Sequence, residues 1–369
     1  MISLSIVIPC LNEADSIEFC LKKIKKIFSI HKFSFKEIIV VDNGSTDDSI
    51  KIAKKYNAKI VFEKNKGYGN SLRTGIKVSK GDYVCFADAD DSYNFLELTK
   101  FIKKAEQGYD LIQGCRFSSY GGKIHKGAMP FSHQYFGNPL LSFLCKVFFN
   151  IKFNDVYCGF RMFKKKLYNK NFYFSKNMEF AVEHLIKSSQ SSKKKIEIPI
   201  TLHKDKRKKT SSHLKTFSDG FKTLKFILTC GSQTPLIITG LSLLLFLVFE
   251  VQQLKGIDNS IFQTRIPITF LIFIQTIFFY LYASLVSQYL GFKKNSIINN
   301  LYKILNFNTA FIISMSGFVL FILFYFFSKF LNFNIFGFTE LELFYFLLFS
   351  FQILINILFV AVLEFFSKS

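Results

Sequence analysis

Three carboxylates stand directly after an apolar run near residue 85. Residues 83–87 have the length and composition of a buried strand, and the carboxylates that follow are Asp88, Asp90 and Asp91. In an open α/β sheet, ligands bind beyond the carboxyl ends of the strands. Close carboxylates repel one another, and Mg²⁺ or Mn²⁺ relieves the repulsion through oxygen ligands shared with water and phosphate. Asp88 and Asp90 are therefore predicted metal ligands, with a solvated acidic turn as the alternative.

Two other predicted strands also end in polar loops. The apolar run 4–9 leads to Asn12 and Glu13, and the run 36–41 leads to the polar loop 42–48, which opens a helix. Such loops place a carboxylate and backbone N–H groups at a strand tip. A third loop contains Lys66 and Gly67, but it fits neither the dinucleotide fingerprint nor the P-loop. A phosphate cradle and a plain tight turn both remain open for it.

The order of elements predicts an α/β fold. Further strands are expected at 59–62, 111–116 and 195–202. The segments between the first strands have apolar residues at helical spacing. Strands that alternate with helices favour a mostly parallel sheet with helices on both faces. We therefore predict one α/β domain over residues 1–202.

Positive charge is concentrated in the first two thirds of the chain. The 369 residues carry a formal charge of +22, yet only seven basic and five acidic residues follow Pro235. A basic domain is typical of proteins that bind nucleic acid, an anionic membrane surface or phosphorylated substrates. The apolar segments described next favour the last two, and a nucleic-acid partner is not expected. The seven cysteines form no Cys-x-x-Cys pair, which fits reduced thiols in the cytoplasm.

The carboxyl-terminal third has the composition of a membrane domain. Residues 203–234 combine lysines with an apolar stripe at helical spacing, which is typical of an amphipathic juxtamembrane helix at anionic headgroups. Residues 235–369 follow as a predicted all-α domain of four transmembrane helices, at about 235–254, 266–292, 309–331 and 343–366. The lysines between the second and third spans place that loop, the amino-terminal domain and the carboxyl terminus in the cytoplasm.

Taken together, these motifs resemble family 2 glycosyltransferases of the GT-A fold, and within them the polyprenyl-phosphate sugar transferases (dolichol-phosphate mannose and undecaprenyl-phosphate glucose synthase-like enzymes). The matching pieces are Ser-Ile-Val-Ile-Pro at 5–9 with Asn12 and Glu13, Val-Asp-Asn-Gly-Ser-Thr-Asp at 41–47, Asp-Ala-Asp at 88–90, Gly-Phe-Arg at 159–161, and Ser-Ser-His-Leu-Lys-Thr-Phe-Ser-Asp-Gly at 211–220.

The resemblance implies roles for these residues. With the polar loops above, the expected nucleotide-sugar-binding residues are Pro9, Asn12, Glu13, Asp42, Gly44, Ser45, Lys66, Gly67 and Asp88. The expected catalytic residues are Asp155, Asp90 and Arg161, with Asp88 and Asp90 on the metal. The expected acceptor- or phosphate-binding residues are Arg116, Arg161, Lys209, Ser212 and Lys215. For Asp155, a positioning role and a general-base role both remain open.

The implied reaction is the metal-dependent, inverting transfer of a hexose to a polyprenyl phosphate at the cytoplasmic face of the inner membrane, as in cell-envelope glycan synthesis. A UDP-sugar is favoured as donor, a GDP-sugar stays open, and a homo-oligomer is compatible with the sequence. One alternative is a glycan or protein acceptor, and another is a tail that helps to translocate the lipid-linked sugar. A processive polysaccharide synthase is disfavoured, because those enzymes use a Gln-x-x-Arg-Trp element and this chain has no Trp.

Overall fold

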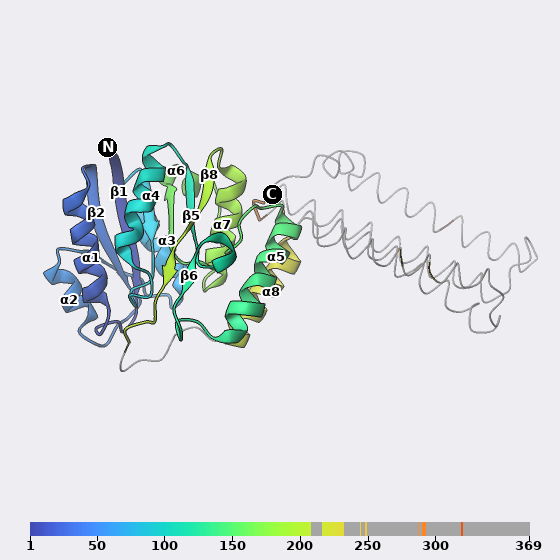
Figure 1. The fold of residues 1–369 in the computed structure, drawn as a ribbon, viewed down its shortest axis with the longest axis horizontal. Helices are drawn as coiled ribbons and strands as arrows, with labels where there is room; N and C mark the ends of the chain where they lie inside the picture. The colour runs from blue at the N-terminus through green and yellow to red at the C-terminus, as the bar shows by residue number, and fades with distance from the viewer. Residues whose placement is uncertain are drawn as a thin grey trace, which may run out of the picture. The chain divides into compact units, whose positions relative to one another are not determined.

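The computed structural model describes residues 1–207 and 216–231, with isolated positions at 244, 248, 287, 290–292 and 319. The chain divides into two compact units, Met1–Ile227 and Leu228–Ser369. The first unit contains the sheet and its flanking helices (Figure 1). The four predicted spans fall, apart from those isolated positions, outside the described residues. Among the helices that are described, none is long and apolar enough to cross a membrane.

A seven-stranded sheet in the order β3-β2-β1-β4-β7-β5-β8 forms the centre of the first unit. Its strands are β1 (Ile2–Cys10), β2 (Phe33–Asp42), β3 (Lys59–Phe62), β4 (Tyr83–Phe86), β5 (Leu111–Cys115), β7 (Arg161–Lys164) and β8 (Lys195–Pro199). All neighbouring pairs are parallel except those of β7, which runs antiparallel to both β4 and β5. The predicted mostly parallel α/β sheet is confirmed.

Helices cover both faces of this sheet, as expected (Figure 1). On one face, α1 (Ile17–Ile30) and α4 (Leu98–Glu106) bury their apolar sides against the β1 side chains Leu4, Ile6 and Ile8. On the other face lie α3 (Tyr68–Val78) and α7 (Glu179–Ser191). A Cβ on Gly75 of α3 would come within 2.3 Å of Val7 Cγ1, so glycine permits the close approach of this helix.

The remaining elements are shorter or lie beside the sheet. They are α2 (Ser49–Lys55), η1 (Phe95–Glu97), η2 (Ser118–Tyr120), β6 (Lys123–Ile124), the π-helical turn η3 (His133–Gly137), α5 (Asn138–Phe149), α6 (Lys165–Asn169), β9 (Thr201–Leu202) and α8 (Thr216–Cys230). Helix η3 runs directly into α5, and α8 packs on α5 through the stacked rings of Phe149 and Phe226, 6.2 Å apart.

Two predicted boundaries differ from the structure. The strand expected at 195–202 is divided, because Ile200 donates its N–H to Cys115 O but accepts from Lys123 N, so the chain changes partners there. Residues 203–207, expected to begin an amphipathic helix, have neither helical nor strand structure. The backbone N–H groups of His203 and Lys206 bond to the carbonyls of Ser92 and Asp90, which holds this strap against the sheet edge. In the described part of this segment, helix α8 comprises Thr216–Cys230.

The carboxyl ends of β1, β2, β3 and β4 meet at one edge of the sheet, since these strands are parallel. Strand β7 begins at the same edge because it is antiparallel, and its first residue Arg161 pairs with Phe86 at the end of β4. Five strands therefore deliver their terminal loops to one place, and most of the predicted site residues lie in those loops.

The ring of Phe101 on α4 stacks on Phe160 at 4.4 Å, and neither side chain has exposed surface. We expect Phe101→Ala to lower the free energy of unfolding by about 3–5 kcal/mol, because it removes a buried ring and leaves a cavity. Hydrogen exchange of the β1 and β4 amides in the full-length protein should then become roughly 10²–10³ times faster. Lys103→Ala on the exposed side of α4 is the matched control, and equal exchange in both variants would contradict the prediction.

Candidate active site

The loops after β1 and β2 are tied to one another by side chains predicted to bind the donor. Asn12 has a left-handed backbone (φ 56°), and its side-chain oxygen accepts from the N–H of Thr46 at 2.7 Å. Its own N–H donates to the hydroxyl of Ser45 at 3.1 Å. Asp42, at the end of β2, accepts from the N–H groups of Gly44 and Ser45 at 3.2 and 2.8 Å. The sheet edge thus carries a pre-formed polar loop beside Pro9, which ends β1 with Cys10.

The loop after β3 joins this group through Asn43. Lys66 donates its ammonium to the carbonyl of Asn43 at 2.7 Å, and the N–H of Gly67 donates to the Asn43 side chain at 2.8 Å. Gly67 has a φ of 133°, and a Cβ there would lie 2.4 Å from the carbonyl of Lys176. Glycine is therefore required by the backbone at this turn. The structure brings Lys66 to the predicted nucleotide loop, and whether it touches a phosphate stays a prediction.

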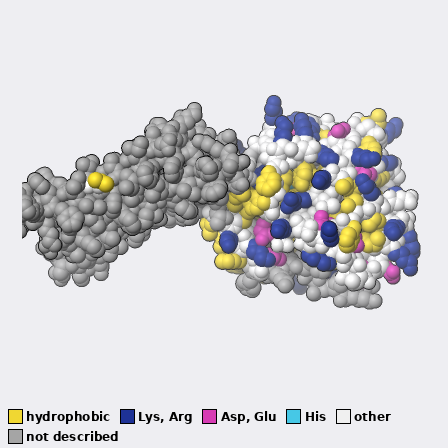
Figure 2. Space-filling model, turned by 180° about the vertical axis from the view of Figure 1, so that it is seen from behind, with side chains coloured by type: hydrophobic (Ala, Val, Ile, Leu, Met, Phe, Trp, Pro, Cys, Tyr) yellow, Lys and Arg dark blue, Asp and Glu magenta, His cyan; other side chains and the backbone are white. Residues whose placement is uncertain are grey.

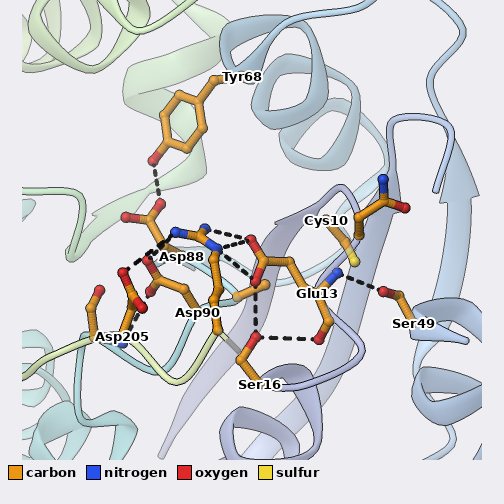
Figure 3. Close-up of polar contacts among 12 residues, drawn as sticks. Cys10, Glu13, Ser16, Ser49, Tyr68, Asp88, Asp90 and Asp205 are labelled. Atoms are coloured by element: carbon orange, nitrogen blue, oxygen red, sulfur yellow. Dashed lines mark hydrogen bonds and ion pairs between the residues drawn. The ribbon is translucent and has the colours of Figure 1, made fainter. Parts of the chain in front are cut away.

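The carboxylates after β4 lie at the centre of the edge (Figure 3). Asp88 accepts a hydrogen bond from the Tyr68 hydroxyl at 3.0 Å, and Asp90 accepts from the N–H of Ser92 at 3.0 Å. Burial, and then the neighbouring charge of Asp90, raises the pKa of Asp88 to about 7, against the opposing effects of Tyr68 and Arg207. Asp91 turns away to Lys23 and Lys206, at 2.7 and 3.1 Å. Within residues 1–207 and 216–231, Asp88 and Asp90 are therefore the two carboxylates of this group without a lysine partner.

A guanidinium group from the strap 203–207 supplies the charge that this pair needs. Arg207 donates from Nε to both carboxylate oxygens of Glu13 and forms a further close pair with Glu13 through Nη2. Its Nη1 lies 3.2 Å from Asp90 Oδ2. Burial opposes the charged form of Arg207, but Glu13 and Asp90 outweigh it and raise its pKa above the usual value. Arg207 occupies the position of a counter-cation between the first and fourth strands.

A second ion pair lies at the end of β5. Arg116 binds Asp155 through two parallel contacts, Nε to Oδ2 and Nη2 to Oδ1, each 2.7 Å, and its backbone N–H donates to Oδ2 at 3.0 Å. Asp155 has no exposed surface. Burial alone would lower the pKa of Arg116, but the charge of Asp155 raises it well above the usual value. Because both oxygens of Asp155 accept from Arg116, the geometry favours a positioning role for this carboxylate over proton transfer.

Tyr93 connects the two ion-pair centres. Its hydroxyl accepts from the N–H of Gly159 at 2.8 Å and lies 3.4 Å from Arg116 Nη1. A Cβ on Gly159 would come within 3.1 Å of Asp88 Oδ2 and 3.3 Å of the Tyr93 ring, so the backbone approaches the carboxylate closely here. Gly159, Tyr93 and the Arg116–Asp155 pair thus form one polar path, which begins beside Asp88.

Arg161 lies in the interior, next to this path. It has no exposed surface, and it donates to Gln113 Oε1 at 2.5 Å, the carbonyl of Ala181 at 2.7 Å and His184 Nδ1 at 3.0 Å. Burial lowers its pKa to about 10. Within the described residues its Nη2 has no hydrogen-bond partner. Arg161 is thus a buried residue, and its contact with a substrate phosphate stays a prediction, since its other donors bind protein groups.

The residues at the centre fit a hard divalent cation that shares its shell with a substrate. Two carboxylates contribute oxygens, the ligands that Mg²⁺ and Mn²⁺ prefer, and a cation already stands beside Asp90 in the form of Arg207. Within residues 1–207 and 216–231, no three His, Cys, Asp or Glu side chains form a complete cage. Asp88 and Asp90 would thus hold such an ion only together with water and phosphate oxygens.

The structure brings most of the predicted residues together. Those at or beside the edge are Pro9, Asn12, Glu13, Asp42, Gly44, Ser45, Lys66, Gly67, Asp88, Asp90, Arg116, Asp155 and Arg161. Lys209, Ser212 and Lys215 lie outside the described residues. The sequence analysis missed Arg207, Tyr68 and Tyr93. Arg207 lies in a run of lysines that matched a membrane-binding stretch, and nothing in its spacing distinguishes it from them.

Comparison with known proteins agrees with this geometry. Residues 5–172 match the model of the family "Glycosyl transferase family 2". This range, a little under half of the chain, is similar to family 2 glycosyltransferases. The matched range contains the strand-end loops, the carboxylates of β4, and both partners of the Arg116–Asp155 pair. Arg207 lies beyond it, so the strap is an addition to the part of the domain that the family model covers.

Proteins similar to this chain include a glycan biosynthesis hexosyltransferase and a second glycosyltransferase from the same organism. The low-salt glycan biosynthesis hexosyltransferase Agl6 of Haloferax volcanii is 32% identical over 227 residues, which cover 61% of this chain and 53% of Agl6. The glycosyltransferase AglJ of the same organism is 26% identical over 162 residues, 44% of this chain and 50% of AglJ. The chain thus spans about half the length of these relatives.

A solved structure with the same fold is glucosyl-3-phosphoglycerate synthase from Mycobacterium tuberculosis, in complex with Mn²⁺, UDP-glucose and phosphoglyceric acid. It is 18% identical, has a TM-score of 0.50, and the match covers 62% of this chain and 79% of the synthase. The likeness concerns the fold alone, and it confirms the expected GT-A-like architecture of the sheet and its flanking helices.

Arg207 competes with a divalent cation for Asp90 if the predicted metal ligands are right. We expect Arg207→Gln to bind Mn²⁺ about fivefold more tightly in the absence of nucleotide, as for an ion pair worth about 1 kcal/mol at a partly open site. Electron paramagnetic resonance of free Mn²⁺ in titrations of the full-length protein measures this.

The matched control is Lys206→Gln, which removes a neighbouring cation that pairs with Asp91 instead of Asp90. Its Mn²⁺ affinity should change less than that of Arg207→Gln. Unchanged or weaker Mn²⁺ binding by Arg207→Gln would show that the guanidinium does not occupy the place of the ion.

Proposed function

We propose that this protein transfers a hexose from a nucleotide-sugar to a polyprenyl phosphate at the cytoplasmic face of a membrane, with Mg²⁺ or Mn²⁺ at Asp88 and Asp90. The observation that carries the proposal is a cavity of about 450 Å³ beside the Arg116–Asp155 pair, with walls that are both aromatic and basic. The polar loops of the sheet edge suit a nucleotide-sugar. The aromatic and basic walls of the cavity suit a phosphate on an apolar chain.

The donor half rests on the strand-end loops. The polar loops around Asn12, Asp42 and Lys66 adjoin the carboxylates of β4, where a nucleotide can lie with its diphosphate toward Asp88 and Asp90. The similar synthase was solved in complex with Mn²⁺ and UDP-glucose, which motivates a UDP-sugar and a divalent ion for this chain as well. The same reasoning allows a GDP-sugar as the donor, and the assay described below distinguishes the two donors.

The acceptor half rests on the cavity. Its walls include the aromatic rings of Phe117, Tyr120 and Phe143 and the ammonium groups of Lys123 and Lys146. Lys146 donates to the side chain of Asn154, which also lines the cavity and directly precedes Asp155. A phosphate near Lys146 would therefore sit close to the Arg116–Asp155 pair, while an isoprenoid chain contacts the rings.

The chemistry needs charge stabilisation more than it needs a base. Cleavage of the sugar–diphosphate bond develops negative charge on the leaving nucleoside diphosphate, which a bound divalent cation stabilises. A phosphate acceptor is already anionic near neutral pH, so it can attack the sugar carbon without losing a proton to the enzyme. Asp155 then holds Arg116 in a fixed orientation at the acceptor side, and inversion at the sugar carbon follows from a single in-line displacement.

The decisive experiment incubates the detergent-purified full-length protein with undecaprenyl phosphate, a divalent ion, and a panel of labelled UDP- and GDP-sugars. Label in an organic-extractable, mild-acid-labile lipid establishes the reaction and names the donor. Asp90→Asn should reduce the rate by about 10²–10³ or more, because it removes a charge that holds the ion. Asp48→Asn, an exposed carboxylate at the same edge, is the control.

Failure of the assay is also informative. If a nucleotide-sugar binds but no lipid is labelled, the polyprenyl acceptor is wrong, and a glycan or protein acceptor comes next. The name of one relative, the glycan biosynthesis hexosyltransferase Agl6, favours a glycan in that case. Activity without any divalent ion would contradict the metal-dependent mechanism.

The cavity makes a separate prediction about Lys146. Lys146→Met keeps the aliphatic length but removes the charge, so the KM for the lipid acceptor should rise about tenfold, as for one charged hydrogen bond. The KM for the donor should stay unchanged. Lys152→Met, at an exposed lysine outside the cavity lining, is the matched control, and equal effects of both variants on the lipid KM would rule out a specific phosphate contact.

A further inference from the structure

Five large apolar side chains lie exposed within thirteen residues of η3, α5 and the turn before them. This group, called here the aromatic surface, consists of Phe131, Tyr135, Phe136, Leu140 and Phe143, with exposed fractions between 55% and 69%. Soluble proteins rarely leave apolar side chains of this size grouped together without a partner.

Helical geometry makes these residues one surface. Because η3 runs directly into α5, Phe136, Leu140 and Phe143 are spaced by four and three residues and share one face. The rings of Tyr135 and Phe136 lie 4.6 and 6.2 Å from the ring of Phe131, which extends the group to the preceding turn. The inner side of α5 is buried through other residues: Leu141, Cys145, Phe148 and Phe149. The described part of the fold therefore buries the inner side of α5 and leaves these outer side chains exposed.

The charge around the aromatic surface is of one sign. The 44 residues between Asp110 and Asp155 contain Arg116 and four lysines but no acidic residue. Of these lysines, Lys123 and Lys126 are exposed in the segment that precedes the aromatic surface. The face of the molecule shown in Figure 2 likewise carries many more Lys and Arg than Asp and Glu side chains. Aromatic side chains beside lysines suit a layer of anionic lipid headgroups over acyl chains.

We propose that the aromatic surface docks onto the interfacial layer of an anionic bilayer, with Phe136, Leu140 and Phe143 inserted among the acyl chains. The charge complementarity selects this occupant over a second copy of the chain, because two copies would bring the same lysines together. Tyr135 and Phe143 also line the cavity described above, so docking brings the cavity wall to the lipid. The proposal rests on the proposed membrane attachment but not on the transfer reaction.

The absence of tryptophan from the sequence gives a clean test. Single variants Phe136→Trp, Leu140→Trp and Phe143→Trp of the full-length protein are reconstituted into vesicles of phosphatidylcholine and phosphatidylglycerol. The same lipids with brominated acyl chains quench a tryptophan that reaches them. Phe62→Trp on β3, at a position that is 65% exposed, is the control outside the aromatic surface. Phe273→Trp, within the predicted span 266–292, reports membrane attachment itself.

We expect brominated lipid to lower the emission of the three α5 and η3 variants about twofold or more, as for side chains that lie 5–10 Å into the bilayer boundary. The emission of Phe62→Trp should stay unchanged. Vesicles of phosphatidylcholine alone should give weaker quenching at the aromatic surface, because the lysines then lack anionic partners.

Quenching at Phe273→Trp but not at the aromatic surface overturns the docking and leaves membrane attachment intact. Absence of quenching at Phe273→Trp and at the aromatic surface overturns both the docking and the membrane attachment. The proposed function would then have to be revised without a membrane. A blue shift at the aromatic surface that depends on protein concentration but not on brominated lipid would assign the surface to a second copy of the chain. Quenching that is equal at Phe62→Trp would also overturn the proposal, since the contact would then not be specific.

Discussion

Electrostatic repulsion among carboxylates is the constraint on which this site depends. Asp88, Asp90 and Glu13 share a partly buried space at the sheet edge, and burial with the charge of Asp90 raises the pKa of Asp88 to about 7. Arg207 offsets the repulsion through Glu13 and Asp90. The acidic centre is thus built from the first ninety residues, and a strap about 110 residues later in the chain completes it. Backbone hydrogen bonds from this strap to the carbonyls of Asp90 and Ser92 hold it in place.

The antiparallel strand β7 connects this acidic centre to the second ion pair. Because β7 begins where β4 ends, Gly159 reaches both Asp88 and Tyr93, and Tyr93 in turn contacts Arg116. Hydrogen bonds therefore run from Gly159, which lies against Asp88, through Tyr93 and Arg116 to Asp155. An enzyme that moves a sugar between two phosphorylated groups needs such a fixed relation, since small displacements of reacting atoms cost large factors in rate.

A common theme of the described surface is the recognition of anions. Lysines line the cavity, flank the aromatic surface and spread over the rest of the unit (Figure 2). A surface rich in lysine thus suits three kinds of anion: a nucleotide diphosphate, a lipid phosphate and the headgroups of an anionic bilayer. The aromatic side chains add the apolar contacts that a lipid requires and that a nucleotide loop does not.

The sequence by itself determined the sheet, its flanking helices and the strand-end residues, because buried strands and amphipathic helices have distinct apolar periods and short polar loops follow them. It also determined which carboxylates follow β4. Only the tertiary structure decided that Arg207 pairs with Glu13 and Asp90, that Asp155 is held by Arg116, and that Arg161 is buried. It likewise showed that η3 and α5 leave five apolar side chains uncovered. These features depend on contacts between residues far apart in the chain. The spacing of residues along the sequence does not predict which distant side chain neutralises a charge or covers an apolar face.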